Sequence, residues 1–426
     1  MKRSLLRGAT ATAVLGAMLG FGAVAASAKT ILMPTLKKEV QAQRAIWKQH
    51  VFAPVGSLQP PAPPCPENGM LPSPFSNCGL PEFPATTLPV PGNMAYYGGH
   101  VQTTPKEYVV FWGWGETGAF PASQSCTAEN LTEGAFTATL ACDPDGAGKY
   151  MADFVQQMGG TDWAGVQTQY YDTDSSGANV NISNPSEQLA GIWADDSSDA
   201  TGMPSTSSSN PPGPTNTYTA LAQEAARAVS HFGITDLANA NIIIAQPPSF
   251  SDPNALASGY CAFHDYTQPN LEGGIYNGIQ PGIAWTNMPY SLAINSGGAN
   301  ECGENGVNSD ARGKLDGFSI VLGHEIEETV TDPGAEDVIG SGASAQQIGG
   351  WYDALDANEN GDKCAWVGEP VTGPVPGGPQ VLPIPGAMGD IKGNGGTTFA
   401  VQSLWSNEAA AGTGYCAGAG TDLPTN

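Results

Sequence analysis

The residues with the clearest potential for chemistry are His324-Glu325-Ile326-Glu327-Glu328, which read H-E-x-x-E. Side chains four residues apart lie on one face of a helix, so His324 and Glu328 would point the same way. The related H-E-x-x-H helix of zinc peptidases has two zinc ligands at this spacing, and the Glu beside the first ligand is the general base for a metal-activated water. Carboxylates also ligate zinc. The motif therefore predicts a zinc site with His324 and Glu328 as ligands and Glu325 as the base.

A zinc site of this kind takes a third protein ligand from beyond the helix. The acidic residues that follow are the candidates for it: Asp332, Glu336, Asp353 and Asp362. The alternative is that no metal binds and that the helix presents a solvated acidic face with one exposed histidine.

The downstream run also resembles the front of a calcium loop. Asp356, Asn358, Asn360, Gly361 and Asp362 match D-x-N-x-N-G-D, a pattern that supplies oxygen ligands to Ca²⁺. Val367 stands where the closing acid of such a loop belongs. A calcium site and a plain turn both remain open for this segment.

Three further residues are candidates for contact with a substrate or with the metal ligands. His264 lies beside Cys261, and is either a structural hydrogen-bonding residue or a contact to substrate or transition state. Tyr352 and Asp353 follow Trp351 in a short aromatic and acidic run.

The N-terminus is typical of a secretory signal. Basic residues precede an apolar run at 9–25, and Ala26-Ser27-Ala28 fits the cleavage rule. The run is too short and too rich in Gly and Ala to favour a membrane anchor. We therefore expect a signal peptide at 1–28, a proline-rich arm, linker or pro-segment at 29–94, and one domain at 95–426.

The composition excludes some partners. The chain has 40 acidic and 15 basic residues, for a net charge of −25, so it should repel nucleic acid and anionic lipid. No G-x-S-x-G elbow, aspartic-peptidase signature, P-loop or dinucleotide fingerprint occurs.

Eight cysteines follow the predicted signal, and an even number in an exported chain indicates disulfides. Neighbours in the sequence suggest the pairs Cys65–Cys78 and Cys126–Cys142, with Cys261–Cys302 and Cys364–Cys416 as further candidates.

Hydrophobic patterns predict the elements that must hold these residues. Strands are expected at 107–113, 179–182, 241–245 and 398–405, and helices at 29–50, 149–158, 218–232 and 316–331. Asp316 would cap the last helix, and Asp332-Pro333 would end it. The fold class is α/β or α+β: a single zincin-like secreted domain with long, disulfide-pinned loops.

Several of these segments resemble the exordium, or phosphate-induced, protein family and its secreted bacterial and fungal relatives. Tyr97-Gly-Gly-His100, the strand through Gly113, the 316–328 helix, Trp351-Tyr352, Gly361-Asp362-x-Cys364 and Phe399–Asn407 are similar to family segments in the same order. The resemblance covers roughly 95–407 and implies an extracellular or periplasmic protein with a zincin-like helix. It carries over His324, Glu325, Glu328 and Asp362, and it favours Asp362 over Asp332 as the third ligand.

These observations lead to two hypotheses. The first is a secreted metallopeptidase-like hydrolase that uses zinc, with a peptide or cell-wall substrate. The second is a non-catalytic extracellular protein that binds cell-wall polysaccharide or a partner and holds a structural zinc or calcium.

Overall fold

The computed structural model describes part of the chain, beginning at Asn93. The described residues are 93–196, 217–251, 255, 260–267, 278–294, 302–309, 311–334, 338–339, 346–347, 349–353, 358–365, 388–412 and 414–418. All of them belong to one compact unit that spans 50–426. The predicted signal peptide, the predicted helix at 29–50 and the Cys65–Cys78 pair lie outside these residues, as do Glu336, Asp356 and Val367.

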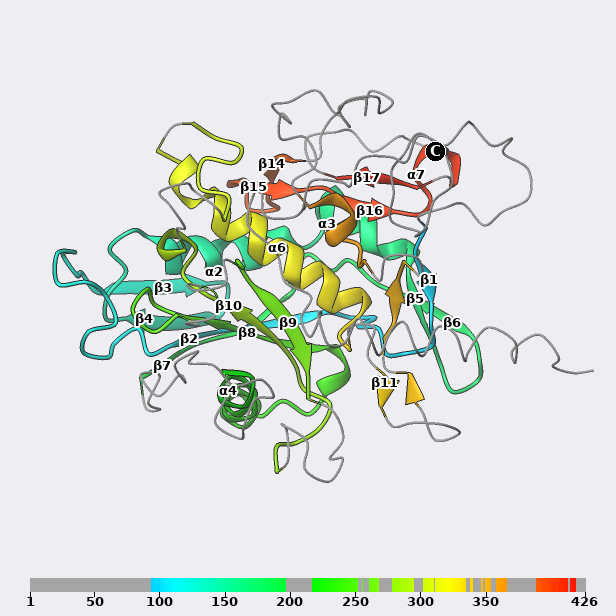
Figure 1. Ribbon diagram of the computed structural model, residues 1–426, viewed down its shortest axis with the longest axis horizontal. Coiled ribbons are helices and arrows are strands. Elements are labelled where there is room, and N and C mark those ends of the chain that lie inside the picture. Colours follow the sequence, from blue (N-terminus) through cyan, green and yellow to red (C-terminus); the bar gives the residue numbers. More distant parts are fainter. Residues whose placement is uncertain are drawn as a thin grey trace, which may run out of the picture. The chain divides into compact units, whose positions relative to one another are not determined.

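A five-stranded sheet lies at the centre of the described residues, in the order β7-β2-β8-β10-β9 (Figure 1). Its strands are β2 (Lys106–Trp112), β7 (Leu189–Asp195), β8 (Ala240–Ala245), β9 (Phe263–Tyr266) and β10 (Ala284–Met288). The strands β7, β2, β8 and β10 run parallel, and β9 runs antiparallel to β10 at one edge. Parallel strands are covered on both faces and therefore read as continuous apolar runs, as β8 does with every residue buried.

Three long helices flank this sheet. They are α2 (Ala147–Met158), α4 (Thr217–Phe232) and α6 (Asp316–Thr331). Figure 1 shows α2 and α6 on one side of the sheet and α4 on the other. The mixture of helices and strands, with disulfides, is consistent with the α+β class. The three helices and the strands at 107–113, 179–182 and 241–245 were predicted within a few residues.

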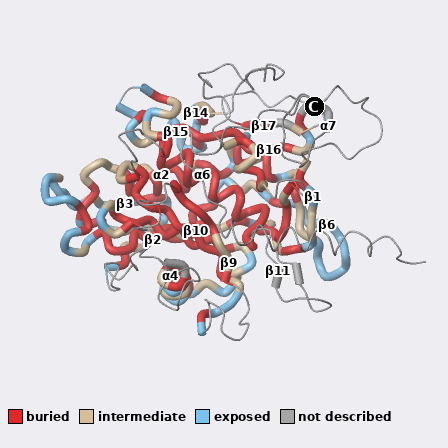
Figure 2. The backbone as a smooth tube through the Cα atoms, in the orientation of Figure 1, coloured by how far each residue is buried: buried red, intermediate tan, exposed pale blue. Residues whose placement is uncertain are grey.

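Helix α6 is buried along its entire length. It contacts β9 and β10 on one side and β15 (Thr398–Gln402) on another, and all of its residues are buried (Figure 2). A helix buried on every face usually carries apolar residues all round, yet α6 carries His324 and three glutamates. The alternative of a solvated acidic face is therefore wrong.

Small two-stranded sheets and short helices complete the described structure. The sheets pair β1 (Ala95–Tyr96) with β13 (Trp351–Tyr352), β3 (Glu129–Glu133) with β4 (Phe136–Leu140), β5 (Tyr171–Thr173) with β6 (Asn179–Asn181), β11 (Val338–Ile339) with β12 (Gln346–Gln347), β14 (Met388–Lys392) with β15, and β16 (Leu404–Ser406) with β17 (Tyr415–Ala417). The short helices are α3 (Asp162–Gly165) and α7 (Ala409–Gly412), with 3-10 turns η1 (Val166–Gln169), η3 (Leu237–Asn239), η4 (Ser291–Ala293), η5 (Gly313–Leu315) and η7 (Asp362–Cys364).

Two sequence predictions differ from the structure. Asp316 does not cap α6, because it is the first helical residue and its carboxylate accepts hydrogen bonds from the backbone amides of Val307 and Asn308. It thus anchors the preceding loop, which sequence spacing does not reveal. The expected strand at 398–405 is divided between β15 and β16, and β17 follows it.

Three predicted disulfides are present in the described residues. Cys126–Cys142, Cys261–Cys302 and Cys364–Cys416 are bonded. The last two close loops across 41 and 52 positions and fasten residues near His264 and Asp362 to distant parts of the chain. No helix in the described ranges combines the length and apolar character that crossing a bilayer requires.

Glu107 of β2 gives the fold a testable pH dependence. Its side chain is fully buried, and Asn241 donates to it at 2.9 Å. Burial raises the pKa of Glu107 from 4.5 to about 8, against the opposing effect of that hydrogen bond. The folded protein therefore binds this proton more tightly than the unfolded chain does. The resulting stabilisation is complete below pH 4.5 and is lost as the pH rises through about 8.

We expect the substitution Glu107→Gln to remove this loss, because the amide stays neutral. One pKa unit corresponds to about 1.4 kcal/mol, so the variant should gain at least about 2 kcal/mol in free energy of unfolding between weakly acidic and weakly alkaline pH, relative to wild type. Urea unfolding of both proteins across this range measures the gain. If the difference in free energy of unfolding between the two proteins did not change with pH, the raised pKa of Glu107 would be contradicted.

Candidate metal centre

Helix α6 places His324, Glu325 and Glu328 in the interior. His324 is 1% exposed, and Glu325 and Glu328 are 0% exposed. Gly323 lets the helix lie against Trp163 and Phe154, because a Cβ there would come within 2.9 Å of the Trp163 ring. Ionised carboxylates are costly to bury unless charges or hydrogen bonds compensate them. The groups around these side chains therefore show what could compensate their charge.

One group of ligand atoms forms around His324. Its Nε2 lies 3.1 Å from Oε1 of Glu328 and 3.7 Å from Oδ1 of Asp362. Ligand atoms that surround zinc tetrahedrally at the usual bond lengths are about 3.4 Å apart. The three side chains therefore fit a divalent cation, and they are the ligands that the motif and the family resemblance favoured. With its side chain 21% exposed, Asp362 is the most accessible of the three.

The turn that carries Asp362 is held against α6 by several contacts. The amide of Asp362 donates to Oε1 of Glu328 at 2.8 Å, and Gln402 donates to the carbonyl of Gly361 at 2.8 Å. Cys364 is bonded to Cys416 in β17. Gly361 permits the approach, because a Cβ at this position would lie 2.7 Å from Nδ1 of His324.

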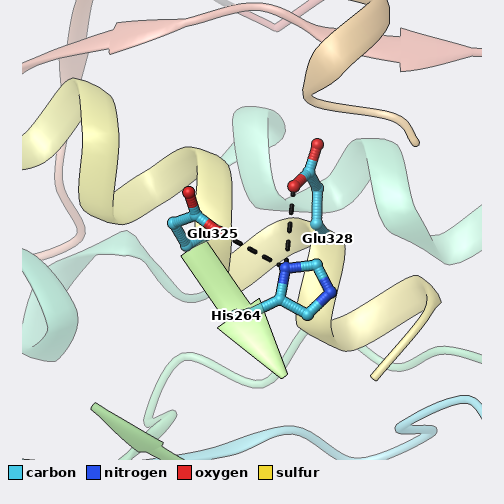
Figure 3. A group of neighbouring side chains, drawn as sticks. All are labelled: His264, Glu325 and Glu328. Atoms are coloured by element: carbon cyan, nitrogen blue, oxygen red, sulfur yellow. Dashed lines mark hydrogen bonds and ion pairs between the residues drawn. The ribbon is translucent and has the colours of Figure 1, made fainter. Parts of the chain in front are cut away.

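A second group of ligand atoms forms around His264, which lies on β9. Its Nδ1 is 3.3 Å from Oε2 of Glu325 and 3.7 Å from Oε2 of Glu328. Figure 3 shows both glutamates reaching from α6 toward the same ring nitrogen. These three side chains also fit a cation. The two groups share Glu328, whose oxygens face different histidines.

The other nitrogen of His264 contacts two further acceptors. Nε2 lies 3.1 Å from the carbonyl oxygen of Asp332 and 3.5 Å from Oε1 of Glu359. Glu359 is fully buried, and the sequence analysis did not single it out. Its position between Asn358 and Asn360, three residues before Asp362, was the available signal.

Burial and neighbouring charges together raise the pKa values of His324, Glu325 and Glu328. Burial opposes the charge of His324, but the carboxylates of Glu328, Glu325 and Asp362 together outweigh burial and raise the pKa of His324 to about 9. Burial, together with the charge of Asp362, raises the pKa of Glu328 to about 7. Burial also raises the pKa of Glu325, which His264 partly offsets. The pocket thus stabilises positive charge and destabilises negative charge, which is the condition that a bound cation satisfies.

The remaining predicted residues have other neighbours. Asp332 accepts a hydrogen bond from the amide of Gly350 at 2.7 Å, and its carboxylate is in neither group of ligand atoms. Asp353 pairs with Lys363 at 2.5 Å, and Tyr352 stacks on Tyr97 with ring centroids 3.9 Å apart.

The described part of the predicted calcium loop has contacts within the protein. The amide group of Asn360 donates to Gln167 and to the carbonyl of Glu327, and the carbonyl of Asn358 accepts from the amide of Asp353. Asp362 faces His324. These contacts do not test calcium binding by this segment, which stays a prediction.

Comparison with known proteins adds no relative: no protein-family model, no curated protein and no solved structure matches the chain.

Proposed function

We propose that this protein is a secreted, metal-dependent hydrolase of the metallopeptidase type, with a zincin-like arrangement around α6. The observation that carries the proposal is the convergence of His324, Glu328 and Asp362 in a buried cluster with Glu325 on the same helix. The motif resemblance to the exordium family and the three disulfides support the extracellular assignment.

In this proposal His324, Glu328 and Asp362 hold a zinc ion. The ion, when bound, supplies Lewis-acid activation of water and of the scissile carbonyl. Glu325 accepts the proton from the attacking water and returns it to the leaving group. His264 lies beside this base, with its Nδ1 3.3 Å from Oε2 of Glu325.

The second candidate is a non-catalytic extracellular protein that uses the same residues to hold a structural cation. The burial of the cluster favours this alternative, because structural zinc sites are closed and catalytic sites keep an open position. The exposed part of Asp362 favours the hydrolase, since it marks a side of the His324 group that is open to solvent.

Elemental analysis of the mature protein beside His324→Ala tests the proposal first. We expect zinc in the wild type, its loss in the variant, and hydrolysis of a quenched fluorescent peptide library that stops on chelation and returns with zinc. A folded, metal-free protein that regains activity supports the hydrolase. Unfolding on chelation without hydrolysis of any peptide supports the structural alternative, and the absence of any cation rejects both.

A further inference from the structure

We propose that the buried cluster binds two divalent cations that are bridged by the carboxylate of Glu328. This rests on the proposed cation site at His324 and adds a second site on the opposite side of Glu328. The ligands of the second site are Nδ1 of His264, Oε2 of Glu325 and Oε2 of Glu328.

The first argument is the orientation of Glu328. Its Oε1 lies 3.1 Å from Nε2 of His324, and its Oε2 lies 3.7 Å from Nδ1 of His264. A carboxylate that directs its two oxygens to two separate groups of ligand atoms is suited to bridge metals. Metals in two-metal sites are about 3.5–4 Å apart, a separation that one carboxylate spans.

The second argument is the orientation of His264. A histidine that ligates a metal usually donates its other ring N–H to a carbonyl or carboxylate, which determines the ligating nitrogen. Nε2 of His264 has both kinds of acceptor, the carbonyl of Asp332 at 3.1 Å and Glu359 at 3.5 Å. If Nε2 carries the hydrogen, Nδ1 of the neutral ring directs a lone pair at the oxygens of Glu325 and Glu328. A cation between these three atoms resolves that repulsion.

The third argument is the balance of charge. Four carboxylates contact His264 and His324, namely those of Glu325, Glu328, Glu359 and Asp362. Ionised, they carry four negative charges beside two imidazole rings that must be neutral to ligate a metal, and one divalent cation leaves two of these charges uncompensated. A second divalent cation balances them. Buried charge without compensation is costly.

Two carboxylate oxygens in the cluster also lack hydrogen bonds. Oε1 of Glu325 and Oε2 of Glu328 are buried and accept none. Buried polar atoms of this kind are rare in folded proteins. Coordination of Oε2 of Glu328 provides its partner, and binding of Glu325 through Oε2 leaves Oε1 to accept the proton from water.

The donor set limits the identity of the cations. Each group offers one imidazole nitrogen and two carboxylate oxygens. Imidazole with carboxylate suits zinc, and Mn²⁺ accepts such ligands, whereas calcium takes oxygen ligands. We therefore infer a pair of transition-metal ions.

Metal stoichiometry tests this inference. The mature protein is stripped with a chelator, reloaded with Zn²⁺, desalted and analysed for zinc. We expect two zinc ions per chain in the wild type, one in His264→Gln, one in Asp362→Asn and fewer than one in Glu328→Gln. The control is His231→Gln, which should bind two zinc ions, because His231 stacks on Trp193 and lies in neither group of ligand atoms.

A spectroscopic measurement distinguishes a bridged pair from two separate sites. Loaded with Mn²⁺, the wild type should give the electron paramagnetic resonance spectrum of an exchange-coupled pair, and His264→Gln that of a single ion. Near-ultraviolet circular dichroism confirms folding of the variant, and Glu325→Gln serves in its place if His264→Gln does not fold.

The outcomes separate this proposal from the preceding one. One zinc per chain that persists in His264→Gln and disappears in His324→Ala would overturn the second site and leave the hydrolase proposal standing. Two ions without magnetic coupling would overturn the bridge. No bound metal would overturn both proposals.

Discussion

The substitution Glu325→Gln is expected to slow peptide hydrolysis by about 10²–10⁴-fold while the cation at His324 stays bound. The amide keeps the shape of the side chain but cannot accept the proton of the attacking water. Neither His324, Glu328 nor Asp362 is altered. Steady-state kinetics on the best substrate from the library screen, with zinc content measured on the same sample, checks both parts of the expectation.

The matched control for this experiment is His264→Gln. Each of the two variants removes one ligand of the second cation, but only Glu325→Gln removes the proposed base. Turnover should therefore remain at least about tenfold higher in His264→Gln than in Glu325→Gln. Equal rates would show that Glu325 acts only as a ligand, and full activity of Glu325→Gln would exclude the mechanism.

The substitution Gly361→Ala is expected to weaken zinc binding at His324 by at least about tenfold, a loss typical of disturbing the residues behind metal ligands. The added Cβ would lie 2.7 Å from Nδ1 of His324 and 2.9 Å from Oε1 of Glu328. Contacts this short do not occur, so either the turn that carries Asp362 or the two ligand side chains must shift. The backbone conformation itself permits alanine, because φ of Gly361 is −75°.

The control is Gly165→Ala, in which φ is −64° and the nearest atom to the added Cβ is 3.4 Å away. Zinc affinity is measured by competition with a chromophoric chelator for both variants, beside thermal unfolding of the metal-free proteins. Wild-type affinity in Gly361→Ala would mean that the turn carrying Asp362 does not determine the geometry of the site.

Burial of the cluster places a constraint on either proposed function. The side chains of His264, His324, Glu325, Glu328 and Glu359 lie beneath the surface of the described structure. In the hydrolase proposal, a peptide would have to approach from the side of Asp362, the partly exposed ligand. The substitution Glu325→Gln distinguishes the two functions, since a protein with a purely structural cation has no peptide hydrolysis for the substitution to slow.

Much of the fold followed from local patterns in the sequence. The strands β2 and β8 were predicted from near-continuous apolar runs, and the helices α4 and α6 from apolar residues that recur with the helical period. Three cysteine pairs were also anticipated, two of them as guesses among many pairings. The spacing of His324 and Glu328 depended only on the geometry of a helix, so this half of the His324 group was readable from the sequence.

What the sequence did not reveal depends on contacts between distant segments. Burial of every face of α6 requires the sheet on one side and β15 on another, and periodicity within one helix does not report it. His264 comes from the edge strand β9 and Glu359 from the turn before η7, 61 and 31 residues from the nearest glutamates of α6. The sequence by itself determined the motif and the elements that carry it. The tertiary structure decided that Glu328 lies between two histidines, because packing rather than local preference brings β9, α6 and the turn at Asp362 together.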